Sequence, residues 1–339
     1  MKVDHGMWGE LASVPEQARR IEAEGFDAAV STEVSTNPFL PMALAAEHTR
    51  RIDVMTSIAV AFARTPMTVA QVAHDLNAYS QGRFVLGLGS QIRPHIEKRF
   101  AMPWSKPASR MREFIRALHA IWDCWYDGAK LDFRGEFYQH TLMTPNFCPA
   151  NTQHGRPRVF LAAVGPVMTE VAGEVADGLI AHGFTTDRYM REVTLPALER
   201  GLAKAGRSRS DFEIVCPVFS VVGANDEAVE GRLAATKRQI SFYGSTPAYR
   251  PVLDLHGWGD LQTELNRMSK AGKWAEMGEL VGDDVVEAFA VVARPERYAD
   301  EVLRRFGDMV DRLVWNDQSW EPGQRTEQLA KLRAGGGVR

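Results

Sequence analysis

Cysteine is scarce in this chain of 339 residues, and long apolar runs and a large excess of one charge sign are missing. Its three cysteines, Cys124, Cys148 and Cys216, lie far apart and form neither a metal-binding spacing nor a disulfide framework. We therefore expect buried, unreactive thiols in a reducing cytoplasm and no metal site. No apolar stretch approaches the roughly 18 residues that span a bilayer, and the first residues lack the apolar core of a signal peptide.

The charge balance argues against two classes of partner. The net charge is −3 at pH 7, and the 40 basic residues form no long run or stripe. Nucleic acids and anionic membranes are therefore poor candidates, and a small molecule is the expected partner. The hydrophobic share of 45% is ordinary for a globular protein. The length suits one barrel domain of roughly 250 residues with insertions, or two average domains.

Short apolar segments alternate with amphipathic helical segments along most of the chain. One helix, for example, should open at Thr65-Pro66, because threonine is a good N-cap and proline suits the first turn. Such βα repeats favour a parallel sheet. The predicted strands cover residues 2–7, 26–32, 52–62, 83–89, 159–163, 178–181, 212–222 and 311–315.

The strand at 83–91, with the sequence RFVLGLGSQ, is the most informative of these segments. Its apolar run is typical of a strand covered on both faces. Gly87 and Gly89 lack side chains where the strand ends, so a flat ligand could approach the backbone. A second glycine turn, Val164-Gly165-Pro166, follows another strand and opens a helix. Together they suggest a cofactor at the carboxyl edge of the sheet, although glycines also end strands without binding anything.

We predict an α/β fold, a (β/α)8 or TIM barrel, with insertions after strands four and seven at about residues 92–156 and 225–284. The first insertion contains a wide apolar helix face over 111–125 and a hairpin over 130–141. A doubly wound open sheet is the alternative, but the pattern Gly-x-Gly-x-x-Gly is absent after the first strand. One domain would cover residues 1–320, followed by a polar tail at 321–339 that frays.

Several motifs, taken in their order along the chain, resemble one known family, the bacterial luciferase-like monooxygenase superfamily. Within it, the chain is most similar to the branch that uses the deazaflavin coenzyme F420. The resemblance covers nearly the whole chain and is weakest over 225–284. The segments that carry it are Phe26-Asp27-Ala28-Ala29-Val30 with Glu33, Thr56-Ser57-Ile58-Ala59-Val60 with Pro66, Gly82-Arg83-Phe84 running into Gly87-Leu88-Gly89, and Ala162-Ala163-Val164-Gly165-Pro166 followed by Ala176-Asp177-Gly178.

The resemblance implies an oxidoreductase that transfers a hydride between coenzyme F420 and a small or medium organic substrate. An FMN-dependent monooxygenase is one alternative, and a non-catalytic flavin- or ligand-binding barrel is another. The sugar-phosphate dehydrogenases of the branch carry an Asp-His pair after strand two and a glutamate after strand four. Here those positions hold Glu33, Val34 and Ile92, which argues against sugar-phosphate oxidation. The apolar helix at 111–125 would allow a homodimer, or it would pack on the barrel.

Barrel enzymes work at the carboxyl ends of their strands, and this rule selects the candidate site. Glu33 and His95 are the candidate proton donors or acceptors; a structural carboxylate and an exposed histidine are the alternatives. By resemblance, strand three carries a bulge near Ala59-Val60 behind the cofactor ring, and the turn before Pro166 helps seat the cofactor phosphate. The expected cofactor contacts are Ser57, Ala59, Val60, Gln91, Ala163, Val164, Gly165, Met168, His182, Gly183 and Phe184.

Four further side chains are candidates for the substrate side of the pocket. His5 ends the first strand and would point into the barrel mouth. Phe62, Trp104 and Tyr138 could form an aromatic wall. Packing in the core is the alternative for all four, because aromatic side chains are often buried for their apolar area alone.

Overall fold

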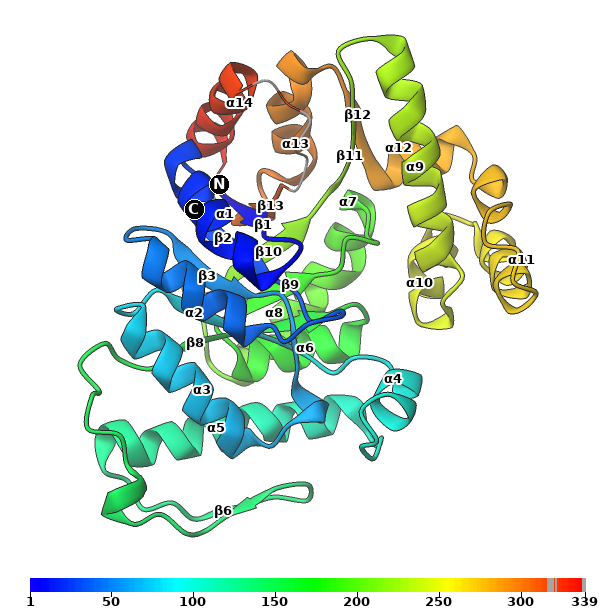
Figure 1. Ribbon diagram of the computed structural model, residues 1–339. Helices are drawn as coiled ribbons and strands as arrows, with labels where there is room; N and C mark the ends of the chain where they lie inside the picture. The colour runs from blue at the N-terminus through cyan, green and yellow to red at the C-terminus, as the bar shows by residue number, and fades with distance from the viewer. Residues whose placement is uncertain (316–319, 321, 337–339) are drawn as a thin grey trace.

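Eight parallel strands form a closed barrel in the computed structural model, which describes residues 1–315, 320 and 322–336 (Figure 1). The strand order is β3-β2-β1-β13-β10-β9-β8-β5-β4, and a β3–β5 pairing closes the ring, with β3 and β4 sharing one position. The predicted barrel is therefore confirmed, and the open-sheet alternative is wrong. The strands are β1 Lys2–Gly6, β2 Ala28–Ser31, β3 Asp53–Thr56, β4 Ala59–Val60, β5 Phe84–Gly89, β8 Arg158–Ala163, β9 Gly178–Ala181, β10 Glu213–Pro217 and β13 Arg312–Val314.

Helices surround the barrel, and their ends follow local sequence signals. The side chain of Thr65 accepts the N–H of Thr68 and begins α3, as predicted. Gly25 takes a left-handed φ of 89° and ends α1. The helices on the barrel are α1 Val14–Glu24, α2 Phe39–His48, α3 Pro66–Tyr79, α4 Arg93–Lys98, α5 Pro107–Asp127, α6 Pro166–Val175, α7 Asp187–Tyr189, α8 Leu195–Lys204 and α13 Tyr298–Phe306, and a π-helical turn at Met190–Thr194 joins α7 to α8.

The apolar face of α5 is buried within the protomer. Its residues Met111, Phe114 and Ile121 are fully buried, and the helix packs against α3 and α6. This face is therefore not free to bind a second subunit, and the expected homodimer stays a prediction that needs another surface. The hairpin that follows, β6 Phe133–Arg134 with β7 Gln139–His140, is antiparallel as predicted.

The second insertion forms a lobe beside the barrel (Figure 1). Its strand β11 Phe219–Val222 pairs in parallel with β12 Ala290–Ala293 and not with the barrel. The single strand predicted over 212–222 is therefore wrong, because the chain leaves β10 at Pro217 and enters another sheet. The helices of the lobe are α9 Asp226–Gly244, α10 Arg250–Leu255, α11 Gly259–Lys270 and α12 Asp283–Phe289. Short 3-10 turns lie at Leu11–Ser13, Ala61–Ala63, Pro145–Phe147, Arg209–Asp211, Pro247–Tyr249, Met277–Leu280 and Pro295–Arg297.

The C-terminal segment is a packed helix for most of its length. Helix α14, Pro322–Gly335, contacts α13 and β1, and its Leu329 and Leu332 are buried. The expected fraying is wrong over this range, because the two leucines are buried, Gln328 accepts the N–H of Ala299 and Arg325 pairs with Glu24. Residues 337–339 of the predicted tail lie outside the described residues.

The three cysteine thiols differ in their burial. Cys216 is buried, and burial raises the pKa of its thiol to about 12. Cys124 and Cys148 are partly exposed, contrary to the prediction of buried thiols.

Among the helices that the structure describes, none combines the length and the apolarity that crossing a bilayer requires.

A buried network of charges closes the amino-terminal end of the barrel. Both Arg312 on β13 and Asp4 on β1 are 0% exposed, and their two parallel hydrogen bonds are each 2.9 Å long. The Arg312 guanidinium also donates to Asp53 on β3 at 2.9 Å and lies 3.5 Å from Glu213 on β10. Arg158 on β8 contacts the same two carboxylates. Side chains from five strands are thus held by one cluster.

Replacing Arg312 with leucine should lower the free energy of unfolding by roughly 3–5 kcal/mol, because Asp4 would stay buried without its partner. Urea unfolding followed by circular dichroism measures the change. The control is Arg304→Ala, which removes an exposed pair with Glu301 and should cost no more than about 1 kcal/mol. Similar small losses in both variants would contradict the role of the buried cluster.

Candidate functional site

The third strand is interrupted at the barrel mouth. The peptide between Ser57 and Ile58 is cis and separates β3 from β4. The Ser57 N–H donates to the carbonyl of Ser31 at 2.7 Å, and the Ile58 carbonyl accepts the N–H of Glu33 at 3.3 Å. The bulge thus lies just before the predicted Ala59-Val60, and Ala59 and Val60 are fully buried in β4.

The glycine pair of β5 makes room for this bulge and its neighbours. A Cβ atom on Gly87 would lie 1.8 Å from the Thr56 carbonyl oxygen, and one on Gly89 would lie 2.9 Å from the side chain of Ile58. A larger residue at either position would therefore collide with the protein itself. The sequence suggested that these glycines open the backbone to a ligand, but the structure fills the space with Thr56, Ile58 and Ile180.

Glu33 and Arg64 clamp the bulge. The Glu33 carboxylate accepts the N–H of Val60 at 2.7 Å and two bonds from the Arg64 guanidinium at 2.7 and 2.9 Å. Its side chain is only 7% exposed. Arg64 also donates to the Val60 carbonyl at 3.0 Å. These contacts match the alternative of a structural carboxylate, and proton transfer by Glu33 stays a prediction. Nothing in the sequence pattern indicated that Arg64 would pair with Glu33.

The loop after β5 carries two other predicted residues. Gln91 has a left-handed φ of 59°, and its side-chain oxygen accepts the N–H of Ile92 at 3.0 Å. His95 lies on the short helix α4 and is exposed. The structure gives neither residue a contact with the bulge, so their roles in binding and catalysis stay predictions.

The ends of β8 and β9 build a turn that is rich in hydrogen-bond donors. Gly165 is the N-cap of α6, with Pro166 at the first position. The next N–H groups, on Val167 and Met168, have no acceptor within the helix because they belong to its first turn. A Cβ atom on Gly165 would meet nothing within 4 Å. This end of α6 is therefore open and suited to an anion.

His182, at the end of β9, is held in one orientation. Its Nδ1 accepts the N–H of Phe184 at 2.9 Å, and its Nε2 lies 3.2 Å from the hydroxyl of Tyr249 in the lobe. The rings of His182 and Tyr249 stack at 4.7 Å. Burial lowers the pKa of His182 to about 4, so the ring is neutral near pH 7. Gly183 lies beside Pro217 and Phe219.

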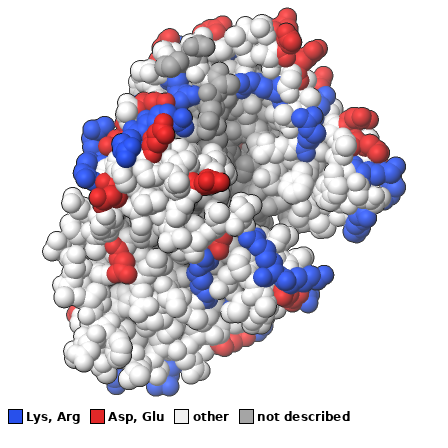
Figure 2. All heavy atoms as spheres, viewed as in Figure 1, with Lys and Arg blue, Asp and Glu red and all other residues white. Residues whose placement is uncertain are grey.

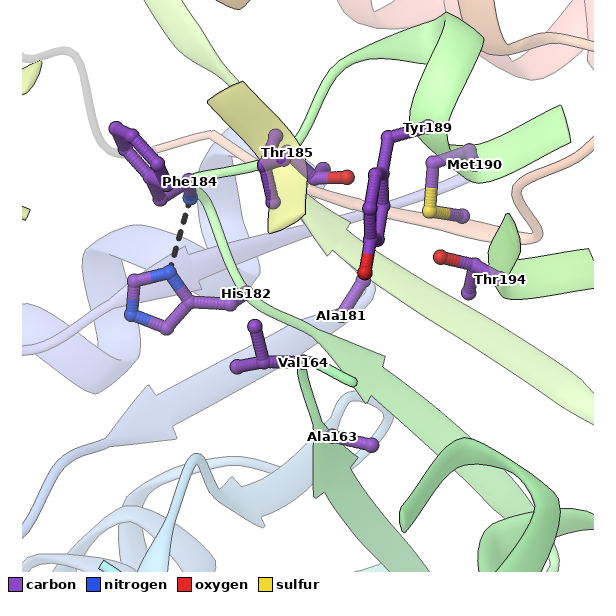
Figure 3. A pocket seen from close by; sticks show the side chains of 10 residues that line it. Ala163, Val164, Ala181, His182, Phe184, Thr185, Tyr189, Met190 and Thr194 are labelled. Carbon is purple, nitrogen blue, oxygen red and sulfur yellow. Dashed lines mark hydrogen bonds between the residues drawn. The ribbon is translucent and has the colours of Figure 1, made fainter. Parts of the chain in front are cut away.

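A small cavity lies behind this turn (Figure 3). Its volume of about 10 Å³ suits one water molecule. Thr185 is 7% exposed, and its hydroxyl has no hydrogen-bond partner among the residues that the structure describes. The hydroxyls of Tyr189 and Thr194 point into the same space. The cavity is lined by Ala163, Val164, Ala181, His182, Phe184, Thr185, Tyr189, Met190, Thr194 and Val252.

The predicted substrate wall is a packed cluster. Phe62 is 0% exposed and meets Trp104 edge to face at 5.8 Å. The Arg110 guanidinium lies 4.4 Å from the Phe62 ring and donates to the Tyr138 hydroxyl at 2.8 Å. The structure therefore brings these three aromatic residues together, but around a buried arginine that the sequence did not single out.

The prediction that His5 points into the barrel mouth is wrong. Successive strand residues point to opposite sides, and Asp4 points into the barrel, where it meets Arg312. His5 therefore faces the helix layer, where its ring meets Phe26 at 4.8 Å and its Nδ1 lies 2.7 Å from the carbonyl oxygen of Gly6. The alternative of a packed core histidine is the observed one. The described residues also contain no group of three or more side chains arranged to hold a metal ion.

Comparison with known proteins defines the family. A family model described as luciferase-like monooxygenase matches residues 3–312. The chain therefore belongs to the luciferase-like monooxygenase family, as the sequence motifs suggested.

Two curated relatives and two solved structures show how similar the chain is to other proteins. The uncharacterized protein Rv1360 of Mycobacterium tuberculosis is 54% identical over 93% of this chain and 92% of its own. Rv3520c of the same organism, whose name assigns it provisionally to the coenzyme F420-dependent oxidoreductases, is 27% identical over 85% and 86%. The F420-dependent tetrahydromethanopterin reductase from Methanopyrus kandleri has a TM-score of 0.78 at 19% identity, with 98% and 96% coverage. The oxygenating component of 3,6-diketocamphane monooxygenase from Pseudomonas putida, in complex with FMN, has a TM-score of 0.65 at 15% identity, with 96% and 92% coverage.

The Glu33–Arg64 clamp should behave as one unit when it is mutated. Glu33→Ala and Arg64→Ala should each lower the free energy of unfolding by roughly 1.5–3 kcal/mol, because each removes charge-assisted hydrogen bonds. The double variant should lose little more than the worse single variant. Urea unfolding of all four proteins measures this cycle; losses that simply add would show that the two side chains act independently.

His182 should make stability depend on pH. Unfolded histidine binds its proton near pH 6.5 and the folded residue only near pH 4. As the pH falls, the unfolded state therefore binds the proton first. The contribution of His182 to the free energy of unfolding is fully present above about pH 6.5, and about 3 kcal/mol is lost as the pH falls to about 4. His182→Asn should flatten the unfolding free energy across this window. Parallel curves for the variant and the wild type would contradict the assignment.

Proposed function

We propose that this protein is an oxidoreductase that transfers a hydride between coenzyme F420 and a small or medium organic substrate. The observation that carries the proposal is the open, donor-rich turn at Gly165, on the same barrel edge as the bulge after β3, in a chain whose relative Rv3520c is named for coenzyme F420. A deazaflavin, when bound, supplies the carbon that carries the hydride, and the protein supplies binding, orientation and proton control.

Different segments at the barrel mouth would bind the cofactor phosphate and support the cofactor ring. The N-terminus of α6, with the N–H groups of Val167 and Met168, would hold the phosphate of the cofactor. The bulge at 57–60, kept in shape by Glu33 and Arg64, would support the ring. Because Glu33 already accepts three hydrogen bonds, we assign it first to positioning the bulge.

An FMN-dependent monooxygenase is the second candidate, because the fold also matches the FMN complex from Pseudomonas putida. Titration of the purified protein with each cofactor, followed by fluorescence, separates the two. We expect F420 to bind at least tenfold more tightly than FMN and to be reduced or oxidised when carbonyl or alcohol substrates are added. Tighter binding of FMN would refute the proposal and favour the monooxygenase. Binding of F420 without turnover of any substrate would favour a non-catalytic barrel.

A matched pair of variants tests where the cofactor binds. Gly165→Leu should fold normally, because a Cβ there meets nothing within 4 Å, yet its side chain would occupy the mouth of the phosphate turn. We expect cofactor affinity to fall at least tenfold with an unchanged melting temperature. Gly231→Leu, on the exposed side of α9 with equal space around it, is the control and should bind as the wild type does. Equal affinity in both variants would exclude this turn as the phosphate site.

A further inference from the structure

Two of the three cysteines, which are far apart in the sequence, meet in the helix layer outside the barrel. Cys124 lies near the end of α5, and Cys148 directly follows the 3-10 turn Pro145–Phe147. Both side chains are partly exposed and pack against the main hydrophobic core. Burial raises the pKa of the Cys124 thiol, and the neighbouring Cys148 thiol raises it further by charge and by a hydrogen bond. The two sulfur atoms are therefore neighbours.

Other contacts hold the chain on both sides of the second cysteine against the same end of α5. Before it, Sδ of Met143 accepts the indole N–H of Trp125 at 3.4 Å. After it, Arg156 pairs with Asp123. Trp125 and Asp123 are the two residues that flank the first cysteine on the helix. The meeting of the two thiols therefore follows from the path of the whole segment 143–156.

The segment that carries Cys148 is accessible and irregular. Residues 148–157 form neither helix nor strand, so a small shift can bring the sulfur atoms to the S–S bond length of about 2.05 Å. The lower left of the molecule, where this segment runs in Figure 1, shows few charged side chains (Figure 2). A charged small molecule therefore meets no strong repulsion there. Cys216 on β10, by contrast, is only 1% exposed.

We propose that Cys124 and Cys148 are a modification site, at which a small-molecule disulfide oxidises the two thiols to an internal disulfide. The bond ties the segment before β8 to α5. That segment enters β8 at Arg158, at the end of the barrel opposite the mouth. The inference does not rest on the proposed function, and its test needs no cofactor.

The reaction is thiol–disulfide exchange in two steps. One cysteine, as the thiolate, attacks a sulfur atom of the small disulfide, whose S–S bond breaks; a mixed disulfide forms and one small thiol leaves. The other cysteine then attacks the protein sulfur of the mixed disulfide. The bond between Cys124 and Cys148 forms, and the second small thiol leaves. The protein loses two electrons and two protons, and the small disulfide takes them up as it becomes two thiols.

The test titrates the reduced protein with oxidised glutathione at about pH 8, where a share of the thiols is ionised. The wild type should become lighter by about 2 Da, the mass of two hydrogen atoms, and should yield one linked pair of peptides containing Cys124 and Cys148. Closing a loop of about 25 residues should raise the melting temperature by about 5 °C. Cys216→Ala is the control and should form the same bond.

The variants Cys124→Ser and Cys148→Ser distinguish a reacting pair from two independent thiols. Each should keep a mixed disulfide with glutathione, because the thiol that would release it is missing. A wild type that keeps both thiols free, or that carries a glutathione on each, overturns the inference. Linked peptides that come from a dimer on a non-reducing gel overturn it as well. A disulfide that leaves the melting temperature unchanged would contradict the tie between the segment and α5.

Discussion

The buried pairing of Arg312 with Asp4 is the constraint on which the rest of the structure depends. A charge without solvent needs a partner at short range, and Arg312 finds its partners on β1, β3 and β10. These strands are far apart in sequence, and the sheet brings their first residues together because β13 lies between β1 and β10. Closure at this end sets the positions of the strand ends at the other, where the candidate site lies. The charge network and the candidate site thus occupy opposite ends of one barrel.

At the open end, packing and hydrogen bonding combine to hold an irregular backbone. Gly87 and Gly89 leave space for Thr56 and Ile58, and Glu33 with Arg64 holds the following strand from outside. The family resemblance pointed to both features, but each works differently from the simplest expectation. The glycines serve the protein's own backbone, and the glutamate is occupied by an arginine. The backbone at the barrel mouth is thereby held by packing on one side and by hydrogen bonds on the other.

The lobe completes the mouth on the side of β8 and β9. Its aromatic residues contact His182 and Phe184, which follow β9 directly. His182 is thereby kept neutral by burial and oriented by two hydrogen bonds. His182 and Tyr249 are 67 positions apart in the chain, so the lobe sets the surroundings of a side chain at the barrel mouth.

The sequence by itself determined most of the barrel strands, the helix starts such as Thr65-Pro66, the hairpin after α5 and the family, because these depend on apolar spacing and turn residues over short stretches; it did not show that the strand predicted over 212–222 divides between two sheets. It also selected the carboxyl edge of the barrel as the candidate site, which stays a prediction. Only the tertiary structure decided that His5 faces the helices, that Arg64 holds Glu33, that 322–335 docks as a helix and that Tyr249 meets His182. Each of these depends on which distant residue lies opposite, and local patterns carry no information about partners that only chain closure brings into contact.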